Sequence, residues 1–146
     1  MKFASPILVL CVMLCSMGCE IGPQSGSGLR LPNGDVVRGK QAFHDLGCDD
    51  CHAIGGEAAR TKAPDGEVIV VLGGKVAHIE SHGELVTSII NPSHGISRRY
   101  PREQVTEADR SRMMNINQKM TVEELINLTA YLQSKYELEL NQIYGP

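Results

Sequence analysis

The stretch Cys48-Asp49-Asp50-Cys51-His52 decides the fold of this chain, because it brings two thiols and an imidazole together in one short segment. Cysteine pairs at this spacing also occur in redox dithiols and in zinc sites. A redox dithiol is disfavoured, since no βαβ pattern surrounds the pair and the carboxylates of Asp49 and Asp50 raise the pKa of a neighbouring thiol. A zinc site is disfavoured because zinc needs a second pair of ligands, and no second cysteine pair stands at a suitable spacing.

The C-x-x-C-H spacing is instead the signature of covalent haem attachment. Two thiols three positions apart on one turn can add to the two vinyl groups of one porphyrin edge, and the next imidazole then points at the iron. We therefore predict one covalently bound haem c per chain, attached to Cys48 and Cys51, with His52 as the proximal iron ligand. Aromatic residues make up only 4% of the chain, which agrees with a porphyrin as the large flat element of the core.

The first 18 residues have the layout of an export signal. Lys2 precedes an apolar stretch over residues 3–17, which is shorter than the ~20 residues that a transmembrane helix needs. The junction Gly18-Cys19 resembles the lipobox of bacterial lipoproteins, although Ser16 stands where that motif usually has Leu. The resemblance implies that residues 1–18 are removed and that the Cys19 thiol is acylated. The alternative is an ordinary cleaved signal with Cys19 left as a thiol.

Removal of the export signal also determines which cysteines and segments the mature protein keeps. The mature part keeps only Cys48 and Cys51 besides the lipidated cysteine, so there is no disulfide framework. We expect a lipidated Cys and Gly/Ser/Pro-rich tether over residues 19–34, one folded domain over residues 35–137 and a loose tail over residues 138–146. By the usual lipoprotein sorting pattern, Glu20 points to the periplasmic side of the outer membrane.

Hydrophobic periodicity predicts three helices and one hairpin. The first helix covers residues 36–46, with Asp35 as N-cap and Gly47 as the stop signal. Two β-branched runs around a Gly-Gly pair, within residues 67–79, predict a β-hairpin. A second helix covers residues 84–90 and ends before a proline.

The last helix has the clearest signals. Thr121 and Glu124 form a capping box. The apolar stripe that follows comprises Leu125, Leu128, Leu132 and Tyr136.

Over residues 36–136 these features resemble class I c-type cytochromes. The resemblance rests on Gly39 and Phe43 ahead of the haem motif, and on residues 120–132 at the last helix. It implies an all-α fold wrapped around one haem, here with a short β-hairpin insertion. It also implies that the first helix crosses the last, so that Gly39 and Phe43 pack on Leu128 and Tyr131.

In that family a methionine on the loop before the last helix is the distal iron ligand. The segment Ser111-Arg112-Met113 matches the family pattern, so we expect Met113 to be this ligand. Met114 is its rival and stands where the family usually has Pro, while Met120 directly precedes the helix cap and is poorly placed. His94 is the alternative distal ligand. Pro64 resembles the family proline whose neighbouring carbonyl holds the proximal histidine.

Charge provides the remaining functional clue. The net charge of -3 argues against a nucleic-acid partner. Residues 98–119 carry six basic and three acidic side chains, whereas residues 42–58 carry four acidic side chains and no Lys or Arg. This polarity predicts that a redox partner docks an acidic patch on the methionine side. The basic residues are Arg98, Arg99, Arg102, Arg110, Arg112 and Lys119.

The expected function is electron transfer without enzymatic catalysis. The resemblance implies a monohaem cytochrome that carries single electrons from a donor to an acceptor, both of them exported or membrane-bound redox proteins. A gas sensor or small peroxidase-like catalyst with a displaceable methionine is one alternative. A haem subunit fixed in a larger membrane oxidoreductase is another.

Overall fold

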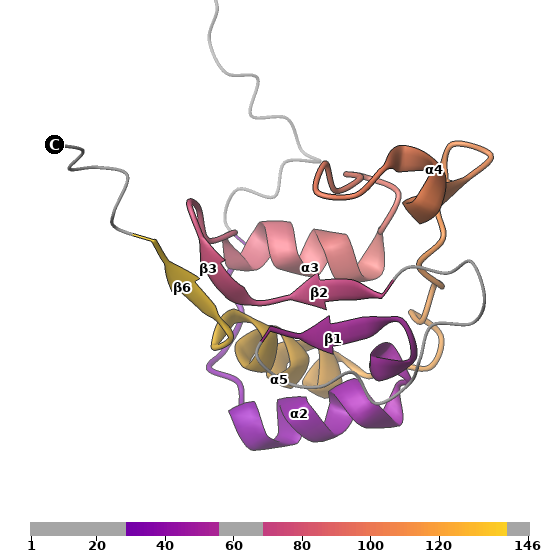
Figure 1. Cartoon of the computed structure of the whole chain (residues 1–146). Coiled ribbons are helices and arrows are strands. Elements are labelled where there is room, and N and C mark those ends of the chain that lie inside the picture. Colours follow the sequence, from indigo (N-terminus) through magenta and orange to yellow (C-terminus); the bar gives the residue numbers. More distant parts are fainter. Residues whose placement is uncertain (1–28, 56–68, 140–146) are drawn as a thin grey trace, which may run out of the picture.

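The computed structural model describes residues 29–55 and 69–139 of the 146-residue chain (Figure 1). Cys19, Pro64 and the expected signal segment lie outside the described residues. Within the described part, no helix has the length and apolar character that a membrane crossing requires.

Helix α2, Val36–Asp45, begins at the predicted residue and ends one residue earlier than predicted, with Leu46 as its C-cap. The carboxylate of Asp35 accepts hydrogen bonds from the backbone N–H groups of Val37 and Arg38, at 2.8 and 3.0 Å, which satisfies two donors that a helix start leaves unpaired. At the other end, Gly47 adopts a φ of 71°, a left-handed conformation that ends the helix at little cost for glycine.

Helix α5, Val122–Gln133, crosses α2 and forms the largest contact between elements in the structure. Its capping box is formed as predicted: the Thr121 hydroxyl accepts from the Glu124 N–H, and the Glu124 carboxylate accepts from the Thr121 N–H at 2.7 Å. The predicted stripe is correct at Leu125, Leu128 and Leu132. It is wrong at Tyr136, which lies beyond the helix in a strand.

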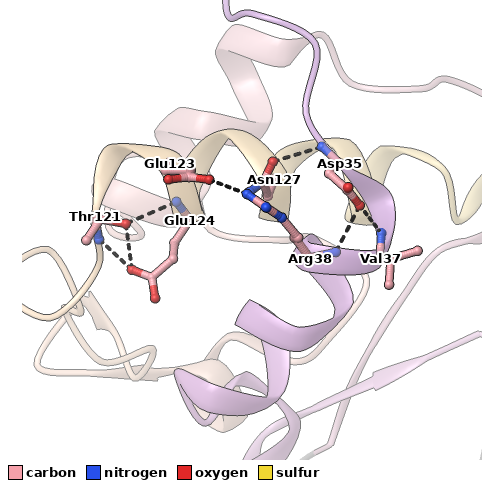
Figure 2. A network of polar contacts seen from close by, with 7 residues as sticks. All are labelled: Asp35, Val37, Arg38, Thr121, Glu123, Glu124 and Asn127. Carbon is pink, nitrogen blue, oxygen red and sulfur yellow. Dashed lines mark hydrogen bonds and ion pairs between the residues drawn. The ribbon is translucent and has the colours of Figure 1, made fainter.

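Figure 2 shows polar contacts that join the beginnings of α2 and α5. The side-chain oxygen of buried Asn127 accepts from the backbone N–H of Asp35 at 2.8 Å. An exposed ion pair joins Arg38 to Glu123 at 2.7 Å and contributes little to stability because water screens it. The buried amide contact therefore sets where α2 starts relative to α5.

Two further helices complete the helical part that the structure describes. Helix α3, His82–Ile90, confirms the predicted second helix, with Ser81 and Glu84 forming a capping box that was not predicted. Helix α4, Arg102–Val105, is a single turn. The core consists of Phe43, Ile54, Leu85, Ile89, Ile116, Leu128, Tyr131 and Leu132. Helices thus supply most of this core, which supports the expected all-α fold in part, since the described residues also contain short strands.

The predicted hairpin is wrong. Strands β2, Val70–Leu72, and β3, Gly74–Val76, exist but do not pair with each other. Strand β2 pairs in parallel with β1, His52–Ile54, and β3 pairs in parallel with β6, Tyr136–Leu138. Gly73 and Gly74 both have a φ of 82°, and the Gly74 N–H donates to the Lys135 carbonyl at 2.8 Å. The glycine pair therefore leads the chain from one partner strand to another.

Strand β6 reaches the first residue of the expected tail, most of which lies outside the described residues. Leu138 belongs to this strand, and the backbone N–H of Glu139 donates to the Val76 carbonyl at 2.9 Å. A third two-stranded sheet is antiparallel and joins β4, Thr106–Glu107, to β5, Arg110–Ser111. Two residues between these strands, Ala108 and Asp109, have positive φ angles.

Candidate functional site

The two cysteines lie on one tight turn. The 3₁₀ helix η1, Cys48–Asp50, follows Gly47 directly, and the Cys51 N–H donates to the Cys48 carbonyl at 3.3 Å. Cys48 is half-buried and packs against the core, whereas Cys51 is exposed. Within the described residues neither thiol takes part in a disulfide. This turn sets the two cysteines three positions apart in one short segment, the spacing that two-point attachment to a porphyrin edge requires.

Burial and charge keep the Cys48 thiol protonated. Desolvation, followed by the negative charge of Asp49, raises the pKa of Cys48 to about 11. The Asp49 carboxylate also lies 2.8 Å from the Nδ1 atom of His44. A thiolate is the reactive form in thiol exchange and in zinc binding, so this environment opposes both alternative functions of the cysteine pair.

His52 is held by the strand that pairs with its own. It is the first residue of β1, and its Nδ1 atom lies 3.3 Å from the carbonyl oxygen of Val70 in β2. Because a carbonyl can only accept, Nδ1 carries the proton and Nε2 keeps its lone pair. Burial lowers the pKa of His52, with the Val70 hydrogen bond acting in the opposite direction. The ring is thus held as the neutral tautomer with the proton on Nδ1, the form in which a histidine can ligate a metal through Nε2.

Val70 is the site residue that the sequence did not identify. The expected acceptor was a carbonyl near Pro64, which lies outside the described residues. The β-branched run at residues 68–71 indicates a strand, but nothing in it shows that this strand pairs with the residues of the haem motif. Only the parallel register of His52 with Val70 places this carbonyl at the imidazole.

The three candidate methionines lie in different environments. Met113 is half-buried just after β5, and its backbone N–H donates to the Ser111 hydroxyl at 3.2 Å. Met114 is 64% exposed. Met120 packs against the same core cluster as Cys48. The structure therefore brings Met120 to the core and holds Met113 on the loop before α5.

The basic side chains of residues 98–119 are all exposed, and α4, which belongs to this segment, lies at the opposite end of the molecule from α2 in Figure 1. Arg102 pairs with Asp109 at 3.4 Å, and the Nε atom of Arg112 donates to the Thr106 carbonyl at 3.1 Å. The alternative distal ligand, His94, is exposed here. A cavity of about 430 Å³ in this surface is lined by Ser93, His94, Ile96, Ser97, Arg98, Tyr100, Arg102 and Asp109.

These residues fit a covalently attached haem. Two cysteines that form no disulfide within the described residues share one turn, and the following imidazole is held through its Nδ1 atom by the Val70 carbonyl. Comparison with known proteins supports the same conclusion, since the family model described as cytochrome c matches residues 36–135. Neither a curated protein nor a solved structure gives a significant match. The chain belongs to the cytochrome c family, whose members bind haem and typically transfer electrons.

Proposed function

We propose that this protein is a lipid-anchored monohaem cytochrome that shuttles single electrons between two exported redox proteins. His52 and Met113 are its proposed iron ligands, Cys48 and Cys51 its haem-attachment residues, and Cys19 its lipidation site. The observation that carries the proposal is the His52 geometry, since the Val70 carbonyl holds the imidazole in the tautomer that binds iron.

Haem bound between an imidazole and a thioether supplies one-electron chemistry at an iron with no open position, and the thioether favours the ferrous state. With such a group bound to His52 and Met113, the protein would accept one electron from its donor and pass one electron to its acceptor. The chain contributes fixed ligands, so coordination is the same in both states. Fixed ligation also leaves no position for a substrate, which favours electron transfer over catalysis.

Of the three methionines, Met113 combines partial burial with a hydrogen-bonded backbone at Ser111. Met114 is 64% exposed and stands where the family usually has Pro, so it is the rival ligand. Met120 fills the core beside Leu125, a role that methionine commonly has.

Exposed positive charges indicate which surface binds the redox partners. Arg98, Arg99 and Arg102 are exposed around α4, on the segment that precedes the proposed methionine ligand. This surface favours an acidic partner, and the donor and the acceptor can use it in turn. Lipidation at Cys19 with a tether over residues 19–34 keeps the domain near the periplasmic face of the outer membrane.

The decisive experiment is the optical spectrum of the matured protein, produced together with haem-attachment machinery. The ferric wild type should show the sulfur-to-iron charge-transfer band, and Met113→Ala should lose it. Met114→Ala and Met120→Ala serve as matched controls and should retain it. Loss of the band only in another methionine variant would reassign the ligand.

Two further outcomes would contradict more than the choice of methionine ligand. If the wild type lacks the band, a distal histidine or an open iron replaces Met113. Rapid binding of carbon monoxide by the wild-type ferrous form would then favour the gas-sensor function. If no covalent haem forms, the proposed function is wrong.

A further inference from the structure

The hydroxyl of Tyr100 lies against the strand that holds the proximal histidine. Tyr100 is half-buried on the loop before α4 and lines the cavity in the basic surface. Its oxygen accepts a hydrogen bond from the backbone N–H of Val71 at 2.8 Å. This contact joins residues 29 positions apart and ties the loop to β2.

The Val71 N–H and the Val70 carbonyl belong to the same peptide group. The described residues contain no cis peptide bond, so this N–H and this C=O point in opposite directions. Tyr100 therefore accepts at one end of the group, while His52 donates its Nδ1 proton at the other end. Figure 1 shows β1 and β2, the two strands that frame this arrangement, side by side.

Hydrogen bonds at the two ends of one peptide group strengthen each other. An acceptor on the N–H polarises the group and makes its carbonyl oxygen more negative. The hydrogen bond that this carbonyl accepts then becomes stronger, by roughly 10–30% in condensed-phase estimates. A stronger pull on the Nδ1 proton increases the electron density at Nε2, and an electron-rich imidazole stabilises ferric over ferrous iron. The direction of the effect is thus a lower reduction potential.

We infer that Tyr100 is a positioning residue that tunes the proximal ligand through the Val70–Val71 peptide group and lowers the reduction potential of the bound haem. The inference rests on the proposed function, because it takes His52 as the iron ligand. Tyr100 acts through one peptide group and one hydrogen bond and need not touch the haem. A purely structural role for this tyrosine, pinning the loop to β2, would alter stability without moving the potential.

The test compares Tyr100→Phe with Tyr136→Phe in the haem-loaded protein. Tyr100→Phe removes one hydroxyl and keeps the ring, and Tyr136 in β6 is a half-buried tyrosine whose strand pairs with β3 instead of β2. At a fixed electrode potential, Tyr100→Phe should raise the ratio of ferrous to ferric protein by about twofold. Tyr136→Phe should leave the ratio unchanged.

Proton NMR of the ferrous protein supplies a readout that does not depend on redox activity. In Tyr100→Phe the Val71 amide proton should move upfield and the His52 Nδ1 proton should exchange faster with solvent. Site-specific fluorination of the Tyr100 ring weakens the oxygen as an acceptor without removing it. The fluorinated protein should show a smaller change in the reduction potential, in the same direction as Tyr100→Phe. It also keeps the inference testable if Tyr100→Phe does not fold.

The outcomes separate the inference from the proposed function. An unchanged potential in the Tyr100→Phe and fluorinated proteins, with haem bound to His52 in the wild type, would overturn the inference alone. An unchanged Val71 amide proton would do the same, because the contact would then be absent. A wild type without covalent haem would overturn both.

Discussion

Gly39 on α2 lies directly against the backbone carbonyl of Asn127 on α5, so the two helices are in backbone contact where they cross. A Cβ atom at position 39 would overlap this carbonyl and would lie 2.6 Å from the Cβ atom of Tyr131. Phe43, one turn later, has its ring centroid 5.7 Å from that of Tyr131. The close approach at Gly39 therefore lets the two aromatic side chains meet.

Replacing Gly39 with alanine should destabilise the haem-loaded protein by about 3 kcal/mol, because backbone atoms cannot move aside as a flexible side chain can. This cost exceeds the ~1 kcal/mol that alanine gains over glycine in a helix. Guanidinium denaturation of the variant measures the difference. Gly83→Ala in α3 is the matched control, since its added methyl would meet only the Ser81 hydroxyl at 4.0 Å. A Gly39→Ala variant as stable as Gly83→Ala would contradict the backbone contact.

The capping box of α5 should make stability depend on pH. Hydrogen bonds from the Thr121 N–H and then its hydroxyl lower the pKa of Glu124 below its usual range. A carboxylate with a lowered folded-state pKa stabilises the fold above its unfolded pKa and loses this contribution as pH falls through the folded value. Glu124→Gln should therefore be less stable than wild type near pH ~7 and should match it near pH ~3.

Denaturation curves of wild type and Glu124→Gln at the two pH values measure this effect. Glu137→Gln, which changes an exposed carboxylate in β6, is the control and should track the wild type at both pH values. If Glu124→Gln is less stable than wild type by the same amount at both pH values, the charge of Glu124 does not contribute to the cap.

Neutralising Arg98, Arg99 and Arg102 to glutamine should change electron transfer according to the charge of the reaction partner. Oxidation of the ferrous protein by ferricyanide, an anion, should slow by about tenfold at low salt. Oxidation by tris(phenanthroline)cobalt(III), a cation, should accelerate. Both effects should shrink as salt screens the exposed charges.

Stopped-flow rates with the two oxidants measure this directly. Arg38→Gln on α2 removes one exposed positive charge at the far end of the molecule and should have little effect (Figure 1). Equal slowing with both oxidants would point to a changed haem environment and against electrostatic steering.

Replacing Cys19 with serine should abolish lipid attachment and release the protein from the membrane fraction, because serine offers no thiol to acylate. Metabolic labelling with a fatty-acid analogue, followed by fractionation, measures both. Ser16→Leu restores the usual lipobox residue and should keep or increase labelling. Labelling that survives in Cys19→Ser would place the lipid elsewhere.

The helices could be predicted because their determinants are local. A cap such as Asp35 or Thr121 acts on backbone groups two or three positions away, and an apolar stripe repeats within one helix. The spacing of Cys48, Cys51 and His52 is likewise set within a single turn. The crossing of α2 and α5 came from the family resemblance, and the structure confirms it at Gly39.

The strand pairings and the environment of His52 were decided by the tertiary structure alone. Parallel strands leave no turn signature, since their connection is long and the cost of closing it depends on everything packed between them. The register that sets Val70 beside His52, and the contact of Tyr100 with Val71 on the same peptide group, join segments far apart in the chain. The sequence by itself determined the helix caps and the C-x-x-C-H spacing, and only the packing of distant segments decided which backbone groups contact those residues.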